Sequence, residues 1–310
     1  KAGYSEAPHV PSLFSHTDGR ILFVLTVDDF DIAYERDEDL QKLLAHLRGL
    51  YEVTVDLDGR RYIGVDTSHD PRAGTMRLSM DSYYRDALEK LGVTKKGHPP
   101  GTPMPYSAPP YGKTGPQMVT HDFSPLASQE QKKYLQRCVG TLLYPARWVD
   151  PLILPALSRL AAHQVAPTQR TMEDLDLLLQ YVAWRSFPSQ TLRRSKMRLM
   201  AAADASFAGE PRARSRAGGV LWLGEEDGTV GAPLSCITSI IPIVVASAAE
   251  AEYATLHTVG SRVLWIRTIL EALGFPQSVS PGTPLLTDND CARGIANRST
   301  KLRQTKALDV

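Results

Sequence analysis

Two aspartates and one glutamate in the last third of the chain have the surroundings expected of metal ligands. Asp204 ends the apolar part of a predicted strand, MRLMAAAD, and Asp288 follows the apolar run PLL just before a predicted helix. Glu252 lies in the helical segment between them. Carboxylates held close together repel each other unless divalent cations lie between them, and two-metal hydrolysis of phosphodiesters requires that arrangement. We expect Mg²⁺, or alternatively Mn²⁺, because these cations prefer oxygen ligands.

Glu252 is the most informative of these acids because of its helical phase. Ser247 and Glu250 have the spacing of a capping box, and Gly274 marks a helix end, which predicts a helix over about 247–273. Glu252 shares its stripe with the apolar residues Ala249, Leu256, Val259, Val263, Ile266, Leu270 and Leu273. A carboxylate on a buried stripe needs a partner. The sequence leaves two kinds of partner open for Glu252, a metal ion and a salt bridge with Arg216 or Arg262.

Basic residues are concentrated near these acids. The segment from Arg193 to Arg216 and the segment from Lys301 to Lys306 are both rich in arginine and lysine. Cationic loops beside the acids would hold the phosphates of a nucleic acid. The candidate contacts are Arg212, Arg214, Arg216, Lys301 and Arg303, although for any single arginine a solvated surface position is the simpler interpretation. Asp204 and Asp288, taken singly, are also more often turn or cap residues than ligands.

The elements that would position these residues follow from the local patterns. Residues 21–34 predict a β-hairpin with Asp28 and Asp29 at its tip, followed by an amphipathic helix with leucines at helical spacing. Residues 94–127 contain eight prolines and predict an extended linker. Residues 128–186 predict helices, and alternating strands and helices begin near Arg193, which indicates a mixed α/β domain. The predicted division is 1–93, 94–127, 128–190 and 191–310.

The composition excludes several classes of protein. Hydrophobic residues make up 43% of the chain and charged residues 22%, as in globular proteins. Neither a membrane span nor a signal peptide is recognisable, so we expect a soluble protein inside the cell, in a cytoplasmic particle or the nucleus. The three cysteines are far apart, which fits free thiols in a reducing compartment.

Longer segments resemble the polyproteins of copia-type LTR retrotransposons. The ribonuclease H domain of that family is similar in order and spacing to DASFAGEPRARSRAGGVLWLG, VVASAAEAEYATL and LLTDNDCARGIANRSTKLRQTKALDV. The distal part of the family's reverse transcriptase resembles YIGVDTS, LSMDSYYRDALEKLGV and QRCVGTLLYPARWVDPLILPALSRL. TVDDF resembles the Y/F-x-D-D hairpin of the polymerase, with Thr26 in place of the aromatic residue.

The resemblance implies an α+β fold. It implies an incomplete reverse-transcriptase palm at 1–93, a proline-rich linker at 94–127, a helical thumb or connection at 128–190, and a ribonuclease H-like α/β domain with a mixed sheet at 191–310. Asp204, Glu252 and Asp288 then correspond to the first three metal ligands of the nuclease. Asp28 and Asp29 correspond to two ligands of the polymerase.

The resemblance also implies that each metal site lacks a ligand in this chain. The family's fourth nuclease acid lies in an Asn-x-x-Ala-Asp motif after a further strand, and the sequence ends at Val310 before that motif. The upstream palm aspartate is absent too, and Ala307 stands where the family commonly has His. Independent polymerase activity is therefore not expected, because two-metal transfer needs all its ligands.

Two functional hypotheses follow. The chain is a reverse transcriptase/ribonuclease H fragment that hydrolyses RNA in RNA–DNA hybrids with Mg²⁺, or it is a decayed or domesticated remnant that binds nucleic acid without turnover. The expected partners are an RNA–DNA hybrid or other nucleic acid and the remainder of a polyprotein.

Overall fold

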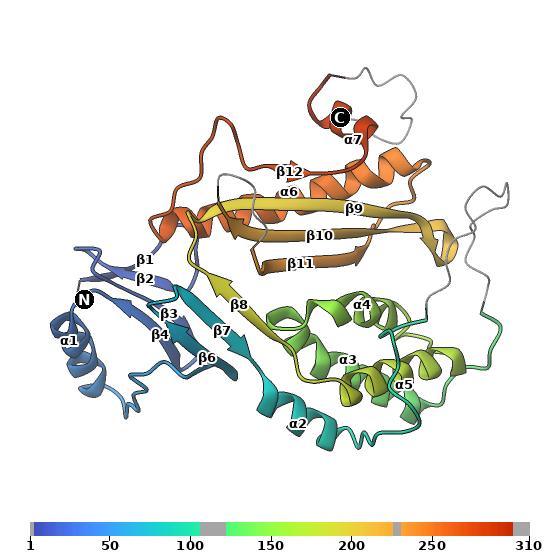
Figure 1. Ribbon diagram of the computed structural model, residues 1–310, viewed down its shortest axis with the longest axis horizontal. Coiled ribbons are helices and arrows are strands. Elements are labelled where there is room, and N and C mark those ends of the chain that lie inside the picture. Colours follow the sequence, from blue (N-terminus) through green and yellow to red (C-terminus); the bar gives the residue numbers. More distant parts are fainter. Residues whose placement is uncertain (1–2, 106–121, 226–230, 300–310) are drawn as a thin grey trace.

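The computed structural model describes residues 3–105, 122–225 and 231–299 (Figure 1). In this part of the chain, helices and strands are mixed, and the strands form three four-stranded sheets. The predicted α+β class is confirmed. Among the described residues, every helix is too short or too polar to serve as a transmembrane span.

The first sheet is an antiparallel sheet near the N-terminus. Its strands β1 (Tyr4–Glu6), β2 (Leu13–His16), β3 (Ile21–Thr26) and β4 (Asp29–Tyr34) follow one another in sequence order. Helix α1 (Asp37–Arg48) covers one face and packs Leu43 against Ile21 and Phe23. The predicted hairpin at 21–34 and the amphipathic helix after it are confirmed.

The second sheet joins segments that are far apart in the sequence. Its order is β5 (Arg61–Tyr62), β6 (Val65–Asp70), β7 (Thr75–Ser79) and β8 (Ser189–Arg193), and β8 pairs antiparallel with β7. Helix α2 (Asp81–Lys90) follows β7 and ends before Gly92. The predicted domain boundaries stay a prediction, but the strand that crosses the expected boundary near residue 190 completes a sheet begun by residues 61–79.

The helical segment after the proline-rich stretch forms the largest apolar core. It contains α3 (Gln129–Trp148), the short helix η1 (Pro151–Ile153), α4 (Leu154–Ala162) and α5 (Gln169–Trp184). The side chains of Ser128 and Thr168 cap α3 and α5. The fully buried Asp150 accepts a hydrogen bond of 2.7 Å from the hydroxyl of Tyr84 and pairs with Arg185.

The third sheet is mixed, as predicted. Its order is β11 (Pro233–Ile240), β10 (Arg214–Gly224), β9 (Arg198–Glu210) and β12 (Leu285–Leu286); β12 runs parallel to β9 and the other pairs are antiparallel. The short helix η2 (Pro211–Ala213) connects β9 to β10.

Helix α6 (Ala248–Ala272) lies along one face of this sheet (Figure 1). Its apolar stripe packs Val259 and Val263 against Leu199 and Leu221. Gly219 allows a close approach, because a Cβ at this position would lie 2.5 Å from Cγ2 of Val259. Helix α7 (Asp290–Ala296) follows β12. Asp204 thus lies on β9, Glu252 on α6, and Asp288 on the short segment between β12 and α7.

Candidate metal centre

Asp204 lies within β9 and not at its end, which corrects the prediction. The register pairs Asp204 with Gly218 of β10, and the ladder continues to Glu210 opposite Arg214. The run of apolar residues does stop at Asp204, but pairing with β10 extends the strand by six residues beyond it. The physical reason is that β10 is long enough to pair with β9 beyond Asp204, and the local sequence pattern of β9 does not reveal this partner.

Asp288 reaches Asp204 through parallel pairing. Leu286 of β12 stands opposite Ala202 of β9, and two residues beyond each of them Asp288, just after β12, lies close to Asp204 within β9. Asn289 then caps α7, because its side-chain oxygen accepts a hydrogen bond of 2.9 Å from the backbone N–H of Ala292. The capping residue holds the backbone immediately after Asp288.

Glu252 lies near the N-terminal end of α6. The helix starts at the predicted residue, because the hydroxyl of Ser247 accepts a 3.2 Å hydrogen bond from the backbone N–H of Glu250, but the predicted capping box is only half formed. The Glu250 carboxylate reaches back to the N–H of Ala246 at 2.7 Å. The side chain of Glu252 reaches β9, and the residue is only 6% exposed. Its Oε1 accepts a 3.2 Å hydrogen bond from the backbone N–H of Ala205, and its buried Oε2 has no hydrogen-bond partner among the described residues.

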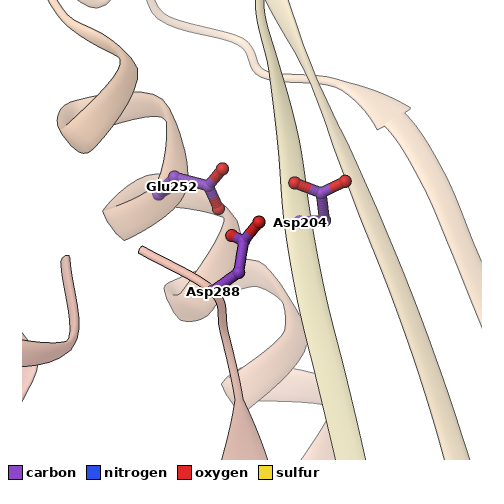
Figure 2. Close-up of side chains that lie close together, drawn as sticks. All are labelled: Asp204, Glu252 and Asp288. Atoms are coloured by element: carbon purple, nitrogen blue, oxygen red, sulfur yellow. The ribbon is translucent and has the colours of Figure 1, made fainter. Parts of the chain in front are cut away.

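The structure brings the three acids together (Figure 2). One carboxylate oxygen from each of Asp204, Glu252 and Asp288 lies within 4.8 Å of the others. Asp204 and Asp288 are exposed, so the cluster is buried on the Glu252 side and open to solvent on the other. We call these three residues the acid cluster.

Burial raises the pKa of Glu252 to about 7. The negative charges of Asp204 and Asp288 act in the same direction, whereas the hydrogen bond from Ala205 lowers the pKa. Among the described residues, no cationic side chain forms an ion pair with Glu252 to stabilise its ionised form. A divalent cation at the acid cluster would supply that charge and a partner for Oε2.

The alternative interpretation, a salt bridge to Glu252, is not what the structure shows. Nε of Arg216 lies 2.7 Å from Oε1 of Glu210 instead. Arg262 is exposed, and within the described residues Glu252 forms no ion pair. An all-oxygen donor set with an orphaned buried oxygen suits a hard cation such as Mg²⁺ or Mn²⁺.

The polymerase-like acids stand apart from this centre. Asp28 and Asp29 are exposed at the β3–β4 turn, where Val27 has a left-handed backbone with φ of 59°. The hydroxyl groups of Thr26 and Tyr62 are 2.8 Å apart beside this turn. Among the described residues, neither aspartate joins a cluster of three potential metal ligands.

The basic candidates fall into two groups. Arg212 is exposed and Arg214 half-buried, both at the turn between β9 and β10. Arg216 is largely buried in its ion pair with Glu210. The predictions for Lys301 and Arg303 lie outside the described residues. The roles of Ala205 and Asn289 were not predicted: an Asn directly before a helix is a cap signal that could have identified the second, whereas a backbone donor carries no sequence signal.

The fold and the acid cluster define a mixed α/β protein with a carboxylate site suited to divalent cations. No protein-family model matches the chain. The chain is similar to the retrovirus-related Pol polyproteins from transposons RE2 and RE1 of Arabidopsis thaliana, with 27% identity over 274 residues and 26% over 277 residues. It is also similar to the retrovirus-related Pol polyprotein from transposon TNT 1-94 of Nicotiana tabacum, with 22% identity over 294 residues.

These alignments cover 87%, 88% and 94% of this chain in the same order, but only 17%, 17% and 21% of the relatives. The chain therefore spans about a fifth of the length of the curated relatives it matches.

Proposed function

We propose that the chain is a reverse transcriptase/ribonuclease H region of a copia-type retrotransposon polyprotein and that its acid cluster hydrolyses RNA in RNA–DNA hybrids. The observation that carries this proposal is the acid cluster, with ligand oxygens within 4.8 Å and a buried Glu252 whose Oε2 has no hydrogen-bond partner in the described part of the chain. The similarity to Pol polyproteins of plant transposons supports the retroelement origin.

Each residue of the acid cluster has a distinct means of support. The hydrogen bond from Ala205 orients Glu252, the ladder with β10 fixes Asp204, and the cap by Asn289 fixes the chain after Asp288. These side chains would hold Mg²⁺ or Mn²⁺. A bound divalent cation polarises a phosphoryl oxygen and generates a nucleophile from water at neutral pH. The open side, formed by Asp204 and Asp288, would face the phosphodiester.

For the polymerase part we propose a structural role in this chain. The exposed Asp28 and Asp29 lack a third acid within the described residues, so they are retained parts of a site that needs more of the polyprotein. The remainder of that polyprotein and the hybrid are the proposed partners. A cytoplasmic particle or the nucleus is the proposed location.

The experiment is Mg²⁺-dependent cleavage of an RNA–DNA hybrid by the wild type and by Asp204→Asn. The matched control is Asp290→Asn, which removes an exposed carboxylate in the first turn of α7 that pairs with Arg293 at 2.9 Å. We expect Asp204→Asn to lose cleavage by about 100-fold or more, as when an essential electrostatic group is removed, and Asp290→Asn to retain it.

Equal activity in the wild type and Asp204→Asn would refute the nuclease proposal. Salt-sensitive binding of the hybrid without any cleavage would instead support the non-catalytic remnant, because phosphate contacts release counterions whether or not chemistry follows.

A further inference from the structure

The turn between β9 and β10 is held in an unfavourable backbone conformation. Arg212 and Ala213 in the turn, and Ala208 near the end of β9, have φ angles of 62°, 53° and 52°, in the left-handed region that disfavours side chains with a Cβ. Such residues persist only where surrounding contacts determine their conformation, and they gather at functional sites. The turn carries the exposed Arg212 and the half-buried Arg214.

Two contacts across the base of the turn supply that constraint. Nε of Arg216 on β10 donates a hydrogen bond of 2.7 Å to Oε1 of Glu210 on β9, and the two side chains are only 14% and 10% exposed. The fully buried hydroxyl of Ser215 accepts a hydrogen bond of 3.0 Å from the backbone N–H of Ala208. These two contacts therefore hold the end of β9 and the start of β10 together.

Arg216 also ties the turn to the helical segment. Its Nη1 donates to the hydroxyl of Ser158 on α4, and that hydroxyl donates a 3.0 Å hydrogen bond to the carbonyl oxygen of Thr238 on β11. One guanidinium thus joins β9, β10 and α4. We call Glu210, Arg216 and Ser158 the hairpin clamp.

The geometry of the hairpin clamp is inconsistent with a phosphate-binding Arg216. If Arg216 turned toward a phosphate, Glu210 would remain as a buried charge without a partner, which is strongly unfavourable. The guanidinium fork is suited to such simultaneous contacts with a carboxylate and a hydroxyl, and a lysine ammonium is not.

We propose that Arg216 is a positioning residue that holds the Arg212–Arg214 turn in place for nucleic acid, and that it makes no phosphate contact itself. The choice of nucleic acid as the partner rests on the proposed function. Arg212 and Arg214 contact the phosphates. Glu210 repels a polyanion, but it supports binding because it holds Arg216 in place. The hairpin clamp also fixes α4 relative to the turn, so that both move as one body.

The sign of the effect of Glu210→Gln tests this proposal. The variant removes one negative charge from the chain, so electrostatics alone predicts tighter binding of a hybrid. We expect about tenfold weaker binding instead, which corresponds to about 1.4 kcal/mol, because the turn loses its constraint. The control is Glu271→Gln, which makes the same charge change at an exposed position near the end of α6 and should leave binding unchanged or slightly tighter.

Arg216→Lys provides a second test with unchanged net charge. A phosphate contact would survive this substitution in large part, whereas a positioning role requires the guanidinium fork and predicts binding as weak as that of Glu210→Gln. Ser158→Ala removes the contact of Arg216 to α4 and the hydrogen bond from α4 to Thr238 on β11, and it should weaken binding less, because the Glu210–Arg216 pair remains. Thermal unfolding of each variant establishes that it is folded.

Hydrogen exchange separates failure of this proposal from failure of the proposed function. The backbone amide of Ala208, which donates to the hydroxyl of Ser215 at the base of the turn, should exchange about tenfold faster in Glu210→Gln than in the wild type, and this measurement needs no ligand. If the wild type binds no hybrid, the proposed partner is wrong and exchange alone decides the role of the hairpin clamp. Unchanged exchange at Ala208, or Glu210→Gln binding as tightly as Glu271→Gln, would overturn it.

Discussion

Replacing Glu252 with glutamine should stabilise the metal-free protein at high pH and leave it unchanged at low pH. Burial and two neighbouring carboxylates raise the pKa of Glu252 from 4.5 to about 7 in the folded chain. At about 1.36 kcal/mol per pKa unit, the shift corresponds to a free energy on the order of 3 kcal/mol. Because Glu252 is only 6% exposed, solvent screens little of this free energy.

The sign of this effect follows from proton linkage. The folded chain binds the Glu252 proton more tightly than the unfolded chain, so the stabilisation is fully present below pH 4.5 and is lost as pH rises through about 7. The amide that replaces the carboxyl group in the variant is neutral at every pH. The free energy of unfolding of Glu252→Gln should therefore match that of the wild type near pH 4.5 and exceed it by up to about 3 kcal/mol above pH 8.

Urea unfolding with a chelator, at intervals between pH 4.5 and 8.5, measures this difference. The matched control is Glu250→Gln, which removes a buried carboxylate that accepts a hydrogen bond from Ala246 at the start of the same helix. That change should destabilise the protein by about 1 kcal/mol, because the carboxylate serves as a cap near the positive end of the helix dipole. A Glu252→Gln variant that is less stable than the wild type by the same amount at every pH would refute the reasoning.

Further substitutions test the packing that supports the site, each by urea unfolding. Gly219→Ala should destabilise by about 1–3 kcal/mol, because its Cβ would meet Cγ2 of Val259 at 2.5 Å; no loss would mean that α6 does not pack this closely. Gly260→Ala, in α6 with open space around its Cβ, should stabilise by about 0.5–1 kcal/mol. Asp150→Ala should cost about 3–5 kcal/mol by leaving Arg185 buried without its partner, and a loss below about 1 kcal/mol would show that the pair is solvated.

The parts of the fold with local signals were predictable. The start of α6 at Ala248 and its end at Ala272 agree with the predicted helix at 247–273, because the cap and the apolar stripe are encoded within one segment. The hairpin at 21–34 and α1 were predictable for the same reason. The pairing of β8 with β7 and the extension of β9 to Glu210 were not predictable, because they depend on strands distant in the sequence or on register.

For the acid cluster, residue patterns identified the members but not their partners. The helical phase of Glu252 predicted its burial, and the structure confirms it. Excluding a salt bridge between Arg216 and Glu252 needed the register of β9 and β10, which places Glu210 within reach of Arg216. Long-range pairing of this kind leaves no periodic trace in the sequence.

Calorimetric titration of the chain with Mg²⁺ at pH 7, in buffers of different ionisation enthalpy, tests the central claim most directly. If Asp204, Glu252 and Asp288 share a divalent cation, the wild type should show saturable binding with release of about half a proton per bound ion, since the pKa of Glu252 is about 7. Asp204→Asn and Asp288→Asn should lose most of this binding. No saturable heat in the wild type, or equal binding by Asp204→Asn, would contradict the account.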